Sequence, residues 1–193
     1  MFEKISSKLH ARSPEVAQRV IELAVEIARE GREGRRIGTL FTVGDAETVL
    51  RHSRPLILDP IATHPEQLRS IWNTDLRGTL KELAQLDGAF IFNDDGVVVA
   101  ASRYLDATAS DIELPMGLGS RHLAAASISK VTQASSIVVS ESAIVRIFED
   151  GSLVGDIIPE LWLMNRERVV SKGRRSQRVR RMTYTTEQKS FST

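Results

Sequence analysis

One short segment of the chain combines residue types that suit phosphate binding. Gly119-Ser120-Arg121-His122 stands directly before an alanine-rich stretch that is typical of a helix. Glycine lets a backbone approach a ligand closely, and a helix N-terminus offers unpaired N–H groups. The hydroxyl, guanidinium and imidazole groups add side-chain donors. The segment therefore predicts a phosphate site, but a helix capped by Ser120 with a solvated Arg121 explains the same residues equally well.

A second segment, Asp87-Gly88-Ala89, lies between a helical and a strand-like stretch. A carboxylate at such a junction can bind a divalent cation or take a proton from a hydroxyl. The two small residues leave room for a ligand beside the backbone. Asp-Gly is also a common turn, so this triplet alone does not distinguish a site from a turn.

Together, the two segments resemble the diadenylate cyclase family. Its hallmarks are an Asp-Gly-Ala motif and a later Gly-Thr-Arg-His-Arg motif, which here read Asp87-Gly88-Ala89 and Gly119-Ser120-Arg121-His122-Leu123. A strand that ends Val139-Ser140-Glu141 follows in the same order as in the family. The resemblance covers residues 37–148.

The resemblance implies an enzyme that condenses two ATP molecules into the second messenger cyclic di-AMP and releases pyrophosphate. Asp87, Arg121 and His122 are the implied catalytic residues. Mn²⁺ or Mg²⁺ is the implied cofactor, bound by Asp87 and Glu141. The implied ATP-binding residues are Gly88, Ala89, Leu105, Gly119, Ser120, Arg121 and His122. Without the family, Leu105 is a core leucine and Glu141 a solvated carboxylate at a strand end.

The chain departs from the family pattern at two positions. Ser120 replaces a threonine and keeps the hydroxyl, whereas Leu123 stands where the second arginine is expected. One phosphate-binding charge is therefore missing. Arg103 and Lys130 are the candidates to replace it.

The implied reaction also predicts a homo-oligomer. The chain has one copy of each segment, yet the product joins two adenylates. Two protomers that face each other about a twofold axis would bring two ATP molecules together.

These segments require a framework of alternating helices and strands. Ser13 and Pro14 begin an amphipathic helix that ends near Gly31. Strand-like runs joined by Asn93-Asp94-Asp95-Gly96 predict a hairpin. The pattern predicts an α/β (α+β) fold with a central mixed sheet flanked by helices. The expected helices are 14–30, 45–52, 76–86 and 123–130, and the expected strands are 37–43, 56–58, 89–92, 97–101, 135–140 and 143–148.

Composition favours one soluble, cytoplasmic domain. The 193 residues include no cysteine, and no apolar run is long enough to span a bilayer. We expect a compact, stand-alone diadenylate cyclase domain over 1–165, with its catalytic core at about 37–148.

A basic C-terminal tail over 166–193 holds nine Lys or Arg residues against two acidic ones. We expect a solvated tail rather than a nucleic-acid contact through residues 166–181, since no aromatic residues are interleaved there. Two alternatives to the enzyme remain: a regulatory module that binds ATP or a cyclic dinucleotide with weakened catalysis, and a nucleic-acid binder that uses this tail.

Overall fold

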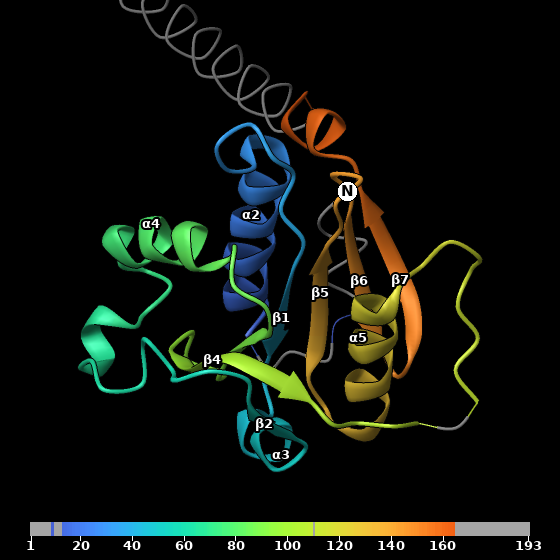
Figure 1. The fold of residues 1–193 in the computed structure, drawn as a ribbon, viewed down its shortest axis with the longest axis horizontal. Coiled ribbons are helices and arrows are strands. Elements are labelled where there is room, and N and C mark those ends of the chain that lie inside the picture. Colours follow the sequence, from blue (N-terminus) through green and yellow to red (C-terminus); the bar gives the residue numbers. More distant parts are fainter. Residues whose placement is uncertain (1–8, 10–12, 110, 165–193) are drawn as a thin grey trace, which may run out of the picture. The chain divides into compact units, whose positions relative to one another are not determined.

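The computed structural model describes residues 9, 13–109 and 111–164. The chain divides into two compact units, and a seven-stranded sheet belongs entirely to the first, Met1–Pro159 (Figure 1). The strand order is β2-β4-β3-β1-β5-β6-β7. β1 and β3 run parallel, while the other neighbouring pairs are antiparallel. The predicted mixed sheet is confirmed.

Most strands lie where the hydrophobic pattern places them. The sheet consists of β1 (Thr39–Val43), β2 (Ser53–Pro55), β3 (Ala89–Phe92), β4 (Val98–Leu105), β5 (Ser135–Val139), β6 (Val145–Glu149) and β7 (Ser152–Ile157). The predicted hairpin is confirmed, since Asn93 and Gly96 close the turn between β3 and β4 through a hydrogen bond of 3.1 Å.

Helix α2 (Pro14–Glu30) begins and ends as predicted. Ser13 Oγ accepts a hydrogen bond from the Val16 N–H at 3.5 Å, and Gly31 ends the helix at a φ of 59°. The apolar side of α2 packs on one face of the sheet, where the rings of Phe41 and Phe90 stack with their centres 5.4 Å apart. This face carries the large aromatic part of the core.

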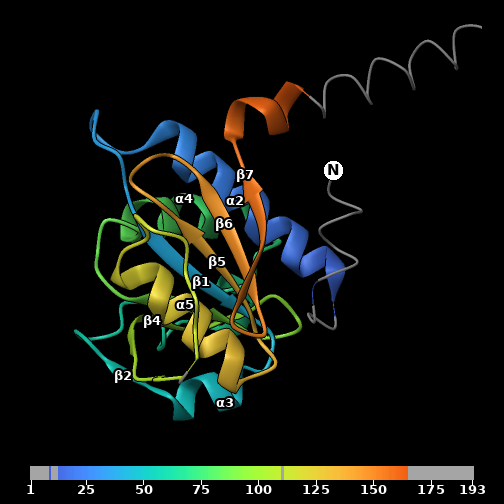
Figure 2. The same cartoon turned by 90° about the vertical axis from the view of Figure 1, so that its right-hand side faces the viewer.

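Helix α5 (Ser120–Val131) covers the opposite face, so the sheet lies between α2 and α5 (Figure 2). Ala125 and Ala126 are fully buried against Leu40 and Val138 of the sheet. Small residues let the helix approach the strands closely, which brings its first turn to the end of the sheet.

The chain forms three further helices between β1 and β3. They are α3 (Ala46–Arg51), the short 3-10 helix η1 (Glu66–Leu68) and α4 (Thr74–Leu83). α4 is tied to α2 because Lys81 pairs with Glu26 at 2.9 Å and with Glu30 at 3.0 Å. Asn73 caps α4, since its side-chain oxygen accepts a hydrogen bond from the Asp75 N–H at 2.9 Å.

The strand predicted over 56–58 is wrong. β2 lies three residues earlier and pairs with the end of β4. Leu56 donates one more hydrogen bond to the Ser102 carbonyl at 3.0 Å, but Ser102 has a φ of 52° and interrupts the regular ladder. The chain then leaves the sheet, so the side chains of Leu56, Ile57 and Leu58 are exposed.

β7 has no counterpart among the predicted strands. Gly155 and the exposed Ser152 and Asp156 break its apolar alternation, although the turn at Asp150-Gly151 precedes it. Within the described residues, no helix combines the length and the apolar character that a membrane crossing needs. The basic segment 166–181 lies outside the described residues.

Candidate active site

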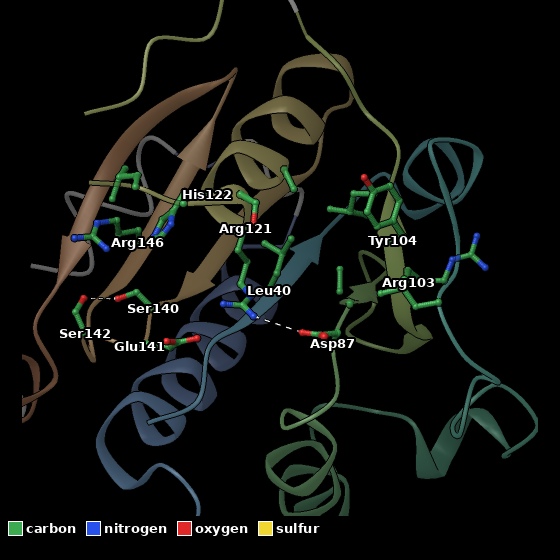
Figure 3. Close-up of a pocket in the computed structure, with 18 of the residues that line it drawn as sticks. Leu40, Asp87, Arg103, Tyr104, Arg121, His122, Ser140, Glu141, Ser142 and Arg146 are labelled. Atoms are coloured by element: carbon green, nitrogen blue, oxygen red, sulfur yellow. Dashed lines mark hydrogen bonds and ion pairs between the residues drawn. The ribbon is translucent and has the colours of Figure 1, made fainter. Parts of the chain in front are cut away.

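A pocket of about 830 Å³ opens at one end of the sheet (Figure 3). The N-terminal ends of β1, β3 and β6, the C-terminal ends of β4 and β5 and the first turn of α5 meet there. Its volume lies in the range of ligand sites. It is lined by every residue that the sequence singles out as a site residue: Asp87, Gly88, Ala89, Leu105, Gly119, Ser120, Arg121, His122 and Glu141.

The first turn of α5 presents its N-terminus to this pocket. Gly119 is the N-cap, in an extended conformation and without a side-chain capping bond. Ser120 is therefore the first helical residue. The alternative interpretation, in which Ser120 caps this helix, is wrong. Its hydroxyl is not used for capping, and the positive end of the helix lies beside it.

Asp87 and Arg121 face each other across the pocket (Figure 3). The Arg121 Nη2 and Asp87 Oδ1 atoms lie 3.7 Å apart, and the Asp87 side chain is 90% exposed. An ion pair this long and this exposed contributes little to stability. Both groups are therefore available to a ligand.

Gly88 has a second reason to be glycine besides the room it leaves for a ligand. Its φ is 105°, and an added Cβ would lie 2.5 Å from the Ser102 carbonyl carbon. The Ser102 backbone cannot move away from such a Cβ as a flexible side chain could, so only glycine allows β4 to lie this close to residue 88. The adjacent Ala89 is buried beside Leu105 in the cluster under α5, so Leu105 is both a core residue and a pocket residue.

His122 lines the pocket but is only 8% exposed. Burial lowers the pKa of its imidazole, and the positive charges of Arg146 and Arg121 lower that pKa further. The carboxylate of Asp156 acts in the opposite direction. The net shift favours the neutral imidazole.

The expected replacements for the missing second arginine are not supported. Arg103 lines the pocket, but its guanidinium donates to Ser53 Oγ at 3.1 Å and to the Ser53 carbonyl at 2.8 Å. Lys130 lies ten residues beyond the start of α5, about 15 Å along the helix, and packs beside Gly151. Leu123 itself is half exposed and does not line the pocket.

Arg146 of β6 is the cation that the sequence analysis misses. It lines the pocket beside His122, and its side chain is 14% exposed. In the sequence it stands between Val145 and Ile147 as one polar position of an alternating strand. Such a residue normally faces solvent, and only the closure of β6 against α5 brings it to the site.

Tyr104 and Leu40 extend the pocket on two further sides and were also not predicted. Tyr104 is partly exposed, and the Arg54 guanidinium lies over its ring at 4.4 Å. These side chains add apolar surface to a pocket that charged side chains line on several sides (Figure 3).

Two carboxylates, Asp87 and Glu141, line the pocket and are exposed. Among the residues that the structure describes, no group of three or more His, Cys, Asp or Glu side chains could hold a metal ion. Mg²⁺ typically binds through one or two carboxylates and takes its other ligands from water and substrate phosphates. The donor set fits a cation that binds with a nucleotide rather than a closed protein cage.

The chain is similar to two curated proteins named diadenylate cyclase. It is 47% identical to that of Methanocaldococcus jannaschii over 160 residues, which cover 82% of this chain and 49% of the relative. It is 41% identical to that of Haloferax volcanii over 151 residues, which cover 77% of this chain and 55% of the relative. The chain thus spans about half the length of these relatives.

Two solved structures are also similar in outline. A double mutant of DacA from Staphylococcus aureus is 23% identical with a TM-score of 0.48, over 77% of this chain and 90% of that one. A hypothetical membrane spanning protein from Bacillus cereus is 22% identical with a TM-score of 0.49, over 72% and 59%.

The family assignment follows from the match to a family model. Residues 26–153 match the family described as DisA bacterial checkpoint controller nucleotide-binding, and this range contains all nine predicted site residues. Because the match covers more than half of the 193 residues, the chain belongs to this diadenylate cyclase family of nucleotide-binding domains.

Proposed function

We propose that this chain is a diadenylate cyclase, which condenses two ATP molecules into cyclic di-AMP and releases two pyrophosphates. The observation that carries the proposal is one pocket that gathers Asp87, Arg121 and His122 inside the family match. The names of the relatives support the same activity, although the chain spans only about half of their length.

The pocket suggests how ATP binds. The phosphates fit the N-terminus of α5, where Ser120, Arg121 and His122 supply donors. The adenine fits the apolar side formed by Ala89 and Leu105. This placement leaves the ribose hydroxyls on the side of Asp87.

The chemistry needs the 3′-oxygen of one ATP to attack the α-phosphorus of the other. The new O–P bond forms as the bond to pyrophosphate breaks, and the hydroxyl proton leaves. Asp87 is the proposed acceptor of that proton, because its exposed carboxylate lies in the pocket. Arg121 offsets the negative charge that develops on the phosphates.

Asp87, with Glu141, would hold a Mn²⁺ or Mg²⁺ ion in the pocket that both carboxylates line. When bound, such an ion lowers the pKa of a coordinated hydroxyl and neutralises phosphate charge. Because this chain offers few oxygen ligands of its own, we expect the ion to bind with ATP.

The proposed reaction requires two protomers. One chain has one such pocket among its described residues, whereas the product contains two adenylates. Two chains that face each other with their pockets adjacent would place each 3′-hydroxyl near the other nucleotide. A homo-oligomer, at least during catalysis, is therefore part of the proposal.

The remaining expectations stay predictions. A domain over 1–165, a cytoplasmic location and a tail that is solvated rather than bound to nucleic acid are not tested by the described residues. The regulatory module is the alternative in which Leu123 leaves the site one phosphate-binding charge short. Arg146 supplies another positive charge in the pocket, which weakens this alternative.

Product analysis tests the activity. The protein is incubated with ATP and either Mn²⁺ or Mg²⁺, and the products are identified by mass. Cyclic di-AMP supports the proposal. If calorimetry shows that ATP binds but no cyclic product forms with either ion, the chain is a binding module instead.

A further inference from the structure

Arg146 is held in place from the strand beside it. Arg146 on β6 and Asp156 on β7 are directly paired across the two antiparallel strands. Arg146 Nε lies 3.2 Å from Asp156 Oδ1, and most of the arginine side chain is buried. Paired residues of neighbouring strands project to the same face, so the ion pair fixes the direction of the guanidinium.

The fixed guanidinium contacts His122 on α5. Arg146 Nη1 lies 3.3 Å from His122 Nε2 (Figure 3). A guanidinium has only donors, so Nε2 has to accept this hydrogen bond with its lone pair. The imidazole is then neutral, and its single proton is on Nδ1.

That Nδ1 atom is buried and has no hydrogen-bond partner among the residues that the structure describes. Native proteins leave few buried donors unpaired, because such a donor has lost its water without gaining an acceptor. His122 lines the pocket at the N-terminus of α5, next to the proposed phosphate site. A phosphate oxygen is the kind of acceptor that would complete this donor.

We infer that Arg146 is a positioning residue of this site: anchored by Asp156, it fixes the tautomer of His122 that offers Nδ1–H to a phosphate oxygen of the nucleotide. The phosphate part of this inference rests on the proposed function. The tautomer part rests on the contacts between the three side chains and does not need a nucleotide.

The charges around His122 agree with a neutral ring. Arg121 on its own helix and Arg146 on β6 lower its pKa after burial, while Asp156 on β7 raises it. The apolar ring of Phe148, also on β6, lies edge-on at 6.2 Å. Removal of the Arg146 charge should therefore raise the pKa of His122 as well as release its tautomer.

The first test measures the tautomer without any nucleotide. The ¹⁵N signals of the imidazole nitrogens are recorded on the full chain, and His122 is assigned by comparison with H122N. We expect a proton on Nδ1 in the unaltered protein. In R146M we expect loss of this preference and a higher pKa of His122. A His122 that carries its proton on Nε2, or the same tautomer and pKa in R146M, would overturn the inference.

The second test measures whether Arg146 acts through His122. The probe is the α,β-methylene analogue of ATP, which cannot lose pyrophosphate. R146M should weaken its binding about tenfold, as expected for loss of one hydrogen bond to a charged group. An asparagine amide offers an N–H near the position of Nδ1 and has no tautomer to fix. In the H122N background, R146M should therefore have almost no further effect on binding of the analogue. If R146M weakens binding equally with His122 and with Asn at position 122, Arg146 does not act through His122.

A third variant covers the case in which R146M does not fold. D156N keeps Arg146 but weakens its anchor, so it should shift the His122 tautomer in the same direction by a smaller amount. No shift in D156N would count against the inference. If the tautomer behaves as expected but the unaltered chain binds no ATP analogue, the proposed function fails while the Arg146–His122 contact stands.

Discussion

The guanidinium of Arg121 occupies the space that a side chain at position 38 would fill. A Cβ added to Gly38 would overlap Arg121 Nη1 and lie 3.0 Å from its Cζ. Gly38 directly precedes β1 and was not singled out from the sequence. Its lack of a side chain leaves room for Arg121 to extend past the N-terminal end of β1 toward Asp87.

Gly38→Ala should displace Arg121 without disturbing the fold. The colliding atoms are the far end of a flexible side chain, so the arginine can move away. We expect ATP binding to weaken by roughly 1 kcal/mol, less than the full loss of a hydrogen bond to a charged group. Calorimetry with ATP measures the effect.

Gly78→Ala is the matched control for that variant. Gly78 lies in α4, where an added Cβ would meet nothing within 4 Å. It should leave ATP affinity unchanged and slightly raise stability, because alanine favours a helix. Equal ATP affinities in the Gly38 and Gly78 variants would show that Gly38 does not position Arg121.

Arg121→Ala should weaken ATP binding by about 1.5–3 kcal/mol, the range for hydrogen bonds to charged groups. AMP lacks the terminal phosphates and should lose less affinity. The comparison is made by calorimetry on both nucleotides. An equal loss for ATP and AMP would remove Arg121 from the triphosphate site.

Asp87→Asn should abolish synthesis of cyclic di-AMP while the protein stays folded. The amide has the same shape as the carboxylate but is neither a base nor an anionic metal ligand. Because the Asp87 side chain is 90% exposed, thermal unfolding should be unchanged. Full synthesis in this variant would show that Asp87 has no catalytic role.

Glu26 should make the contact between α2 and α4 depend on pH. Burial alone would raise the pKa of Glu26, but Lys81 and Arg77 outweigh it and lower the pKa. A lowered pKa means that the carboxylate stabilises the fold above its unfolded-state pKa of about 4.3, and that this stability is lost as the pH falls through the folded-state pKa.

Glu26→Gln should therefore lower the free energy of unfolding near pH 7 by roughly 0.2–1 kcal/mol, since the groups are partly exposed. The difference from the unaltered protein should shrink in urea unfolding below about pH 4. A difference of the same size at both pH values would contradict the role of the charge.

The sequence predicted those elements whose ends are determined by neighbouring residues. Ser13 and Pro14 at the start of α2 and the Asn93–Gly96 turn act through neighbouring residues, so their effect is visible in the sequence. The strand predicted over 56–58 does not form, because strand pairing there depends on the backbone at Ser102, which is distant in the sequence. The apolar residues at 56–58 do not indicate whether the neighbouring strand is available for pairing at these positions.

The site residues also divide into those that local motifs predict and those that depend on distant contacts. All residues of the two motifs except Leu123 line one pocket, because each motif lies at the end of a strand or helix. Arg146 and Gly38 act through contacts with residues distant in sequence, namely His122 and Arg121. Spacing within the sequence has no signal for such contacts.

In the proposed reaction, two bound ATP molecules, one from each of two protomers, become one cyclic di-AMP. The most direct test measures cyclic di-AMP by mass at a series of protein concentrations, with ATP and Mn²⁺ or Mg²⁺ in excess. We predict that the rate per protomer rises with protein concentration until the facing pair is saturated. A rate per protomer that stays constant down to concentrations at which light scattering detects only monomer, or no cyclic product at any concentration, would contradict the account.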